Sequence, residues 1–374
     1  MSLRVTADFD AGNIELVRVD GDTVDLRIRR DAQSDFYQWF YFRIDGAAGR
    51  DLTLRILNAG GAAYPLGWPG YRACVSDDDA DWRRTETDYR DGVLTIRHRP
   101  AGEQVWFAYF APYSSERHQA LIARAAASPH VGHHVLGHTL DDRPLDLLRV
   151  GTGNLQLWLY ARQHPGETMA EWWMEGALDL LLSDDPVAHL LRERATLHLV
   201  PNMNPDGSAR GHLRTNAAGV NLNREWREPS VQRSPEVYHI RAVMDETGVD
   251  FALDVHGDEA IPYVFMAGFE GIPSWNEAQA GLYGRYLQLL SEETPDLQTK
   301  HGYPVAGAGQ ANLSMSTNQL AERYGAVSMT LEMPFKDNND APDDSAGWSP
   351  PRSKALGQAC LRALAKLLPD LATR

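Results

Sequence analysis

The sequence predicts an α/β fold, in which a mixed central sheet carries helices on both faces, preceded by an all-β sandwich. Two observations lead to this prediction. Residues 1 to about 110 contain short strand-like runs separated by Gly- and Asp-rich turns, without a convincing amphipathic helix. Beyond that point, strand-like and helical runs alternate, which favours a sheet covered by helices. We therefore expect one domain over residues 1–112 and a second over residues 113–374.

The first domain opens with a predicted hairpin. Residues 13–20 and 23–30 alternate in polarity around Gly21-Asp22, a pattern typical of two antiparallel strands joined by a tight turn. Further strand-like runs follow at residues 38–44, 51–57, 93–99 and 104–110. Short strands at this spacing indicate a β-sandwich.

The second domain is expected to begin with a short helix capped by Ser114 or Ser115. Strand-like runs then cover residues 154–161, 195–201, 250–256 and 326–333, and helical runs cover 168–182, 234–247, 276–291 and 353–367. Thr168 with Glu171 matches a capping box, and Ser234-Pro235-Glu236 places a capping residue, a first-turn proline and an acid in order. Gly248 is a suitable end for the second of these helices.

Composition excludes several classes of function. No window reaches the roughly 18 apolar residues that a membrane helix needs, and the start lacks a basic segment followed by an apolar run. The formal net charge of -15 opposes nucleic acid or an anionic membrane as the main partner. With only two cysteines, Cys74 and Cys360, we expect a cytoplasmic protein with reduced thiols. The oligomeric state stays open.

Polar side chains gather where the predicted strands of the second domain end, and ligands of open α/β sheets bind beyond the carboxyl ends of the strands. The candidates are His164 and Glu167 after strand 154–161, the Asn-rich turn 202–207 after strand 195–201, His256 at the end of strand 250–256, and Glu332 on strand 326–333. An HxxE pair alone is more often a surface turn than a metal site. The downstream partners are what favour a site here.

Two imidazoles and one carboxylate form a set of ligands typical of catalytic zinc, which keeps its fourth position for water. His164 and Glu167 share one turn, bent by Pro165-Gly166, and His256 comes from a distant strand. We expect one zinc ion at these three side chains. Glu332 is then available as a general base.

A polar run downstream adds guanidinium and amide donors. It extends from Arg210 to Arg214 and continues over residues 219–226. The planar fork of arginine suits a carboxylate or a developing oxyanion.

With these pieces in this order, the chain resembles the M14 metallocarboxypeptidases, and most closely their cytosolic carboxypeptidase branch. The matching motifs are HPGE (164–167), PNMNPDG (201–207), NLNREW (221–226), DVHGDE (254–259) and TLEMPF (330–335). The segment QWFYFRI (38–44) resembles the β-sandwich that precedes the catalytic domain in that branch.

The resemblance implies a zinc carboxypeptidase that hydrolyses the C-terminal peptide bond of a peptide or protein. It also implies a role for each matching residue: His164, Glu167 and His256 as zinc ligands, Glu332 as general base and later proton donor, Arg214 as the group that polarises the scissile carbonyl, and Asn223 with Arg224 as the grip on the terminal carboxylate. The branch often selects acidic C-terminal residues, and we carry this preference over as an expectation.

Two positions depart from the family pattern or are hard to place. At the position of Asn221, many members have an aspartate, which orients a zinc-bound histidine. A neutral amide raises the basicity of the ring less than a carboxylate does. The mobile tyrosine of the family is assigned to Tyr303, with Tyr324 as a weaker candidate.

The same residues are compatible with two other functions. A related zinc amidohydrolase could deacylate a small amino-acid derivative with the same zinc ligands, and a carboxylate-binding protein could retain the fold without catalysis. His130, His134 and His138 have helical spacing, but Pro129 and the neighbouring glycines oppose a helix, so we expect a strand or loop and no metal there. Trp172, Trp173 and Met174 are expected to be the buried face of the helix after Glu167.

Overall fold

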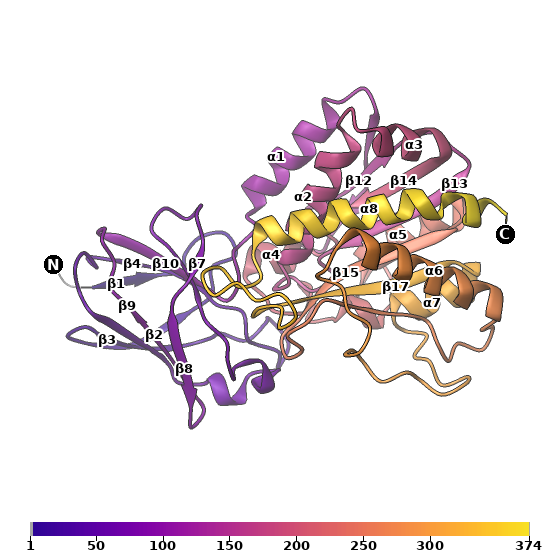
Figure 1. Cartoon of the computed structure of the whole chain (residues 1–374). Helices are drawn as coiled ribbons and strands as arrows, with labels where there is room; N and C mark the ends of the chain where they lie inside the picture. Colours follow the sequence, from indigo (N-terminus) through magenta and orange to yellow (C-terminus); the bar gives the residue numbers. More distant parts are fainter. Residues whose placement is uncertain (1–2, 374) are drawn as a thin grey trace.

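The computed structural model describes residues 3–373, and two five-stranded sheets form its N-terminal part (Figure 1). Their orders are β1-β4-β10-β6-β7 and β2-β3-β5-β9-β8. The strands are β1 (Arg4–Thr6), β2 (Glu15–Asp20), β3 (Thr23–Arg27), β4 (Tyr41–Asp45), β5 (Leu52–Ile56), β6 (Cys74–Ser76), β7 (Arg83–Arg84), β8 (Glu86–Arg90), β9 (Val93–His98) and β10 (Gln104–Ala108). All six predicted strands are present.

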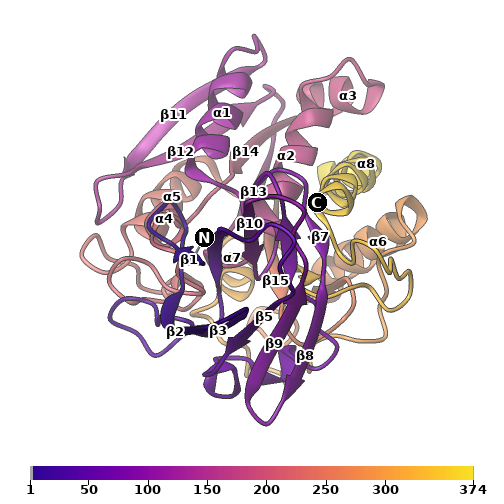
Figure 2. The same cartoon turned by 90° about the vertical axis from the view of Figure 1, so that its left-hand side faces the viewer.

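Alternating side chains hold these two sheets together as a sandwich. Leu94 and Ile96 of β9 are buried, as are Phe42 of β4 and Phe107 of β10, and all four belong to one hydrophobic core. Figure 2, which looks from the sandwich end, shows β5, β9 and β8 side by side. The predicted hairpin joins β2 to β3 through Gly21, whose φ of 62° suits a tight turn.

A seven-stranded mixed sheet forms the second part, in the order β11-β12-β14-β13-β15-β17-β16. Its strands are β11 (Val131–His138), β12 (Pro144–Val150), β13 (Leu155–Ala161), β14 (Ala195–Val200), β15 (Phe251–Asp258), β16 (Phe265–Ala267) and β17 (Val327–Pro334). The four central strands are parallel, and β11, β12 and β16 pair antiparallel at the edges. The mixed sheet is therefore confirmed, whereas the boundary between residues 112 and 113 stays a prediction.

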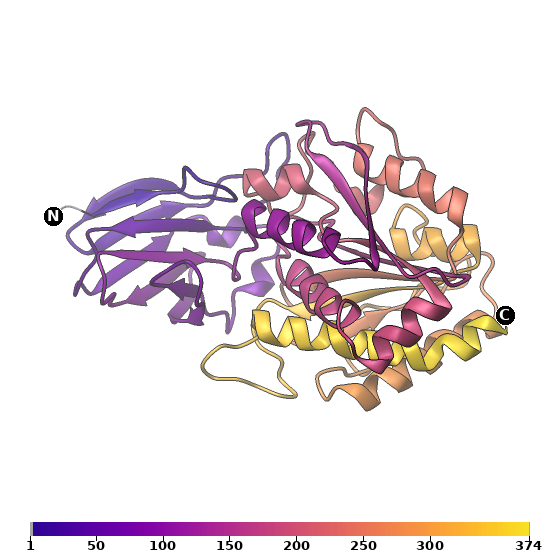
Figure 3. The ribbon, with the colours of Figure 1, turned by 90° about the horizontal axis from the view of Figure 1, so that it is seen from above.

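Helices cover both faces of this sheet (Figures 1 and 3). They are α1 (Ser115–Ala126), α2 (Met169–Leu181), α3 (Pro186–Arg194), α4 (Pro205–Arg210), α5 (Pro235–Thr247), α6 (Glu277–Glu293), α7 (Ser316–Tyr324) and α8 (Pro350–Ala372). Leu157 and Leu159 of β13 join a core with α2 and α8, while Trp158 and Tyr160 join a second core with α5 and α7. Because neighbouring side chains of a strand point to opposite faces, β13 is buried on both.

The predicted helix boundaries were mostly right, but two predicted caps were wrong. Ser114 accepts a hydrogen bond from the amide of Arg117 at 3.1 Å, and Gly248 ends α5 as expected. Thr168 does not cap α2, because its hydroxyl donates to the carbonyl of Ala111 at 2.8 Å. Ser234 makes no side-chain cap on α5 either, although Pro235 does open that helix.

None of the helices in residues 3–373 combines the length and the apolar character needed to cross a bilayer.

Candidate active site

One cavity of about 670 Å³ brings the predicted site residues together. Its lining includes His164, Glu167, Arg214, Asn223, Arg224, His256, Tyr303 and Glu332. Tyr324, the weaker tyrosine candidate, is not in this lining, and its hydroxyl donates to Asp245 instead. The cavity lies at the carboxyl edge of the parallel strands, because His256 on β15 and Glu332 on β17 are register partners near the ends of their strands.

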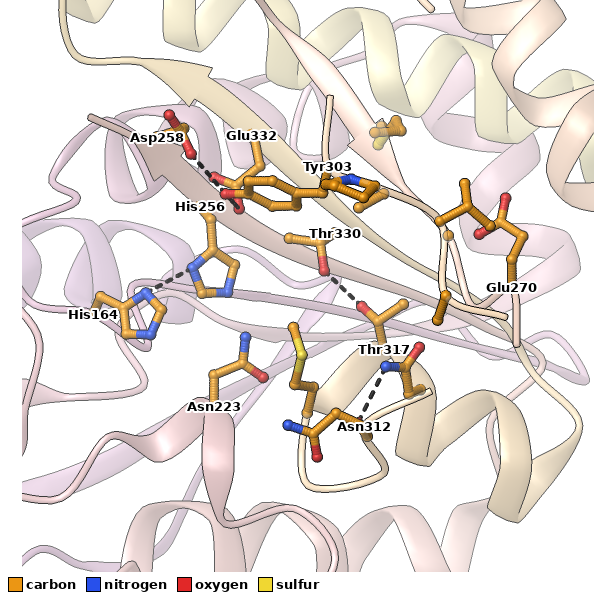
Figure 4. Close-up of a pocket in the computed structure, with 18 of the residues that line it drawn as sticks. His164, Asn223, His256, Asp258, Glu270, Tyr303, Asn312, Thr317, Thr330 and Glu332 are labelled. Atoms are coloured by element: carbon orange, nitrogen blue, oxygen red, sulfur yellow. Dashed lines mark hydrogen bonds between the residues drawn. The ribbon is translucent and has the colours of Figure 1, made fainter. Parts of the chain in front are cut away.

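The three predicted metal ligands are buried and converge (Figure 4 shows the two histidine rings). The carboxylate of Glu167 lies 2.7 Å from Nδ1 of His164 and 2.7 Å from Nδ1 of His256. The two Nδ1 atoms are 3.1 Å apart. Within residues 3–373, this is the only group of three or more His, Cys, Asp or Glu side chains whose ligand atoms lie within 4.8 Å of one another.

The outer nitrogen, Nε2, of each ring faces a side-chain oxygen, which bears on whether Nδ1 is free for a metal. Nε2 of His164 faces Oδ1 of Asn221 at 3.1 Å, and the same oxygen accepts the amide of Asn223, which fixes it as the oxygen. Nε2 of His256 lies 2.8 Å from Oδ1 of Asp254. If Nε2 carries the proton in both rings, both Nδ1 lone pairs point at the same place as Glu167, so the residues fit a divalent metal ion.

Electrostatics differ between the two rings. Burial and the nearby Arg214 lower the pKa of His164 to about 4, although Glu167 opposes them. Burial also lowers the pKa of His256, but Asp254 and Glu167 outweigh it and hold that pKa well above its usual value. Burial raises the pKa of Glu167, yet the two histidines bring it below the usual range.

Only one of the two carboxyl oxygens of Glu332 accepts a hydrogen bond among the described residues. Its Oε1 accepts the hydroxyl of Tyr303 at 3.0 Å, and that hydroxyl also lies 2.8 Å from Oδ2 of Asp258 (Figure 4). Its Oε2 is buried without a hydrogen-bond partner among the described residues. Burial raises the pKa of Glu332 well above its usual value; His256 opposes this, while Glu167 and Asp258 add to it.

Arg214, Asn223 and Arg224 also line the cavity. Nη1 of Arg214 lies 3.9 Å from Oε1 of Glu167. The Asn223 side chain accepts the amide of Ser316 at 2.9 Å, and Arg224 donates to the Asn223 carbonyl at 2.6 Å. Burial and the charge of Arg214 lower the pKa of Arg224, and no carboxylate pairs with Arg224 in the described part of the chain.

The prediction of a strand or loop for His130, His134 and His138 is confirmed. His134 and His138 lie on the exposed strand β11, and His130 lies in the turn before it. The tip of the β11–β12 hairpin contains Asp142, whose φ is 59°. Trp173 and Met174 are fully buried in the core, which agrees with a packing role.

Sequence reasoning missed several residues that shape the site. Asp254 could have been found, because it precedes His256 by two positions on one strand and must share its face. Gln163 donates to Asp254 at 2.7 Å and adjoins His164, yet nothing in the motif assigned it a role. Asp31, Phe36 and Tyr64 come from the sandwich, and no signal in the sequence links them to the cavity.

Two imidazoles, a carboxylate and a further glutamate lie at the carboxyl edge of a mixed α/β sheet. This arrangement is typical of metal-dependent hydrolases. The family model "Zinc carboxypeptidase" matches residues 118–334, and "Cytosolic carboxypeptidase N-terminal domain" matches residues 5–110. The chain thus belongs to the M14 zinc carboxypeptidase family, and it is an enzyme of the metallocarboxypeptidase class. The predicted family and fold are both confirmed.

Individual relatives agree with this assignment. An uncharacterised protein of Zymomonas mobilis is 59% identical over 99% of this chain and 98% of that one. Mouse cytosolic carboxypeptidase 4 is 30% identical over 70% of this chain, which spans only 28% of the mouse protein. A metallo-carboxypeptidase from Pseudomonas aeruginosa, solved with (2-guanidinoethylmercapto)succinic acid, has a TM-score of 0.96 and 44% identity, covering 98% of this chain and all of that one.

Proposed function

We propose that this chain is a zinc carboxypeptidase that releases the C-terminal residue of a peptide or protein. The observation that carries the proposal is a single cavity in which the His164, Glu167 and His256 group, the Glu332 carboxyl and two arginines all meet. Zinc is proposed as the metal, because two imidazoles and one carboxylate are a common catalytic zinc set. The named residue roles below belong to the same proposal.

The metal would be held by Nδ1 of His164, Nδ1 of His256 and the carboxylate of Glu167. When bound there, a zinc ion supplies Lewis acidity, which polarises a carbonyl group and lowers the pKa of water. Asp254 and Asn221 keep the two rings in the tautomer that presents Nδ1.

Glu332 is proposed as the group that accepts a proton from the attacking water and passes it to the leaving amine. Its free Oε2 supports this role, because a buried oxygen without a partner is available to a water in the cavity. A cation at the three ligands favours the ionised carboxylate by attraction, against the burial that raises the pKa of Glu332. Tyr303 holds the other oxygen and so orients the carboxyl.

Arg214, Asn223 and Arg224 are proposed to receive the negative charges of the substrate. Arg214 lies nearest the metal ligands and suits the developing oxyanion, whereas Asn223 and Arg224 suit the terminal carboxylate. Two neighbouring guanidinium groups repel each other, and Arg224 has no carboxylate partner in residues 3–373. An incoming carboxylate would relieve this repulsion.

The rest of the cavity offers room for the side chain of the released residue. Thr317 and Thr330 are buried there with hydroxyl oxygens 2.7 Å apart, and Glu270 lies at the end away from His164 (Figure 4). Within the described chain, Arg214 and Arg224 are the only arginine or lysine residues in the lining. The preference for acidic C-terminal residues stays a prediction from the family resemblance.

Two observations compete with that prediction. Glu270 would repel an acidic side chain and attract a basic one. The Pseudomonas aeruginosa relative was solved with a ligand that carries both a guanidino group and a succinic acid. The test measures kcat/KM for peptides that differ only in the C-terminal residue. This residue should be Arg or Lys as well as Glu, Phe and Ala.

The test of the proposed function compares wild-type protein with Glu332→Gln. Wild type should bind one zinc per chain and release single C-terminal residues. The variant should retain zinc, since Glu332 is not a ligand, and lose about 10²- to 10⁴-fold in kcat, the usual worth of a general base. Zinc content by atomic absorption and released amino acids by mass spectrometry are the measurements. Preserved hydrolysis in the variant would remove Glu332 from its proposed role.

A cytoplasmic location is proposed as well. Cys74 and Cys360 are both buried free thiols, which suits a reducing compartment.

A further inference from the structure

Residues 211–219 form the segment that carries Arg214. This segment is held by the sandwich, not by the sheet that carries the proposed metal ligands. Asp31, in the sandwich, is buried and accepts three successive backbone amides of this segment. Oδ1 lies 2.6 Å from the amide nitrogen of Leu213, and Oδ2 lies 2.8 Å from that of Arg214 and 3.0 Å from that of Thr215. The Thr215 hydroxyl adds a fourth donor at 3.1 Å. One carboxylate therefore fixes the backbone on both sides of Arg214.

Both ends of the segment are clamped against sandwich backbone. Gly211 has a φ of 69°, and a Cβ there would lie 2.6 Å from the carbonyl oxygen of Ala11. Gly219 has a φ of 72°, and a Cβ there would lie 2.4 Å from the carbonyl oxygen of Gln33. Only glycine combines this conformation with so close an approach. The segment 211–219 is thus fitted to the sandwich along its length.

The sandwich also supplies two aromatic rings to the Arg214 side chain. The guanidinium carbon lies 5.7 Å from the ring centre of Phe36 and 5.3 Å from that of Tyr64. Both distances are within the range of cation–π attraction. Tyr64 itself lines the cavity. The guanidinium therefore contacts two sandwich residues, and its Nη1 lies 3.9 Å from Oε1 of Glu167.

The same segment touches the metal turn. The Leu213 carbonyl accepts the amide of Gly166 at 2.8 Å, and Gly166 lies between His164 and Glu167 in the sequence. The position of Arg214 relative to the metal ligands is therefore set through the Leu213 backbone, which Asp31 holds.

We propose that the sandwich is part of the catalytic apparatus: Asp31, Phe36 and Tyr64 are positioning residues that aim the Arg214 guanidinium at the reacting carbonyl. This inference rests on the proposed function of Arg214. It assigns the N-terminal part a task beyond stability, because a misplaced donor no longer meets the charge that develops in the transition state.

The test is a double-mutant cycle between Asp31→Asn and Arg214→Ala, with kcat and KM measured per bound zinc on the best peptide found for wild type. If Asp31 acts through Arg214, Asp31→Asn should lower kcat about tenfold with little change in KM, and should change kcat less than twofold when Arg214 is already alanine. Equal losses in both backgrounds, or no loss in wild type, would overturn the proposal.

A matched control comes from a second carboxylate that joins the sandwich to the helical part. Asp10 accepts the backbone amide and the hydroxyl of Ser115, both at 2.7 Å, at the start of α1. Asp10→Asn should leave kcat unchanged in both backgrounds, since Asp10 bonds Ser115 at the start of α1 and makes no hydrogen bond to the segment 211–219 among the described residues.

A second variant covers the case in which Asp31→Asn does not fold. Phe36→Leu removes one ring from the guanidinium and leaves the Asp31 contacts in place, so it enters the same cycle. A loss of kcat that vanishes in the Arg214→Ala background supports the proposal, and an additive loss contradicts it. If wild type itself releases no C-terminal residue, the proposed function has failed, which is a different outcome from an additive cycle.

Discussion

At the scale of single residues, the two rings proposed to bind the metal have unequal hydrogen-bonding partners. His256 has the buried carboxylate of Asp254, whereas His164 has only the amide oxygen of Asn221. A carboxylate raises the basicity of a ligating imidazole more than an amide does. Asp254 is itself fixed by Gln163, whose own oxygen accepts the indole N–H of Trp226 at 2.8 Å. His256 is therefore the more strongly supported of the two rings.

Asp254→Asn should weaken zinc binding about 10- to 100-fold, because a neutral amide raises the basicity of the ligating imidazole less than a carboxylate does. Asn221→Asp should act in the opposite direction, since it adds a carboxylate behind His164. Both effects are measured as zinc dissociation constants by competition with a chelator. Identical constants for wild type and Asp254→Asn would contradict the account of this support.

Glu236, at the first turn of α5, makes stability depend on pH. Burial raises its pKa to about 8, although Asn216 donates to both of its oxygens. Because folding raises the pKa of Glu236, its contribution to stability is fully present below about pH 4.5, declines as the pH rises, and is lost as the pH passes through about 8.

Wild type should therefore lose on the order of 3 kcal/mol of unfolding free energy between pH 5 and pH 8 through this carboxyl. Glu236→Gln, which cannot ionise, should lack that part of the decline. Urea unfolding of both proteins at pH 5, 6, 7 and 8 is the measurement. Parallel curves for the two proteins would show that Glu236 is not the source.

The site could be predicted from the sequence as far as its residues lie at strand ends. His164, His256 and Glu332 follow or end predicted strands, so sheet geometry brings them to one edge. The Thr168 and Glu171 cap failed for a specific reason. Glu171 faces inward, 2.6 Å from Nη1 of Arg162 and 2.6 Å from Nδ1 of His118, and tertiary partners outcompete the local motif.

At the scale of elements, helices α2 and α8 cross at two glycines. A Cβ on Gly176 of α2 would lie 2.2 Å from the carbonyl oxygen of Lys354, and a Cβ on Gly357 of α8 would lie 2.3 Å from that of Trp173. The two backbones therefore touch, and each glycine makes room for the other helix. Since α2 begins directly after the metal turn, this crossing also anchors Glu167.

Gly176→Ala should destabilise the protein by about 1 to 3 kcal/mol, because the methyl group forces the helices apart. Gly281→Ala is the matched control: this residue lies in helix α6 with no atom within 4 Å of an added Cβ. It should stabilise by about 0.5 to 1 kcal/mol through helix propensity. The measurement is the free energy of unfolding in urea for wild type and both variants. Equal effects of the two substitutions would contradict the close crossing of α2 and α8.

Strands at the centre of the second sheet were predictable, whereas several edge strands and short helices were not. The four central strands of the second sheet were found within a few residues, because they are largely buried and rich in apolar residues. Strands β7 and β16 have two and three residues, and their pairing depends on neighbours that no local pattern reveals. Helices α3 and α4 begin at prolines in polar segments and were missed for the same reason.

At the scale of the whole molecule, the net charge of the chain is opposite in sign to the two arginines of the cavity. The chain carries a formal net charge of -15, yet the cavity contains two arginines beside the metal ligands. Attraction for a substrate carboxylate is therefore local to the cavity. The arrangement of the sandwich against the segment 211–219 could not be predicted, because contacts such as Asp31 with Leu213 join residues 182 positions apart.

The most direct measurement compares one peptide with a free and with an amidated C-terminus, each incubated with zinc-loaded protein and followed by mass spectrometry. If Asn223 and Arg224 grip the terminal carboxylate, the free peptide should lose single residues from its C-terminus. The amidated peptide should be turned over at least 10²-fold more slowly, as expected when a charged group that the site is built to bind is missing. Equal turnover of the two peptides would contradict the exopeptidase account and favour an amidohydrolase with the same metal ligands.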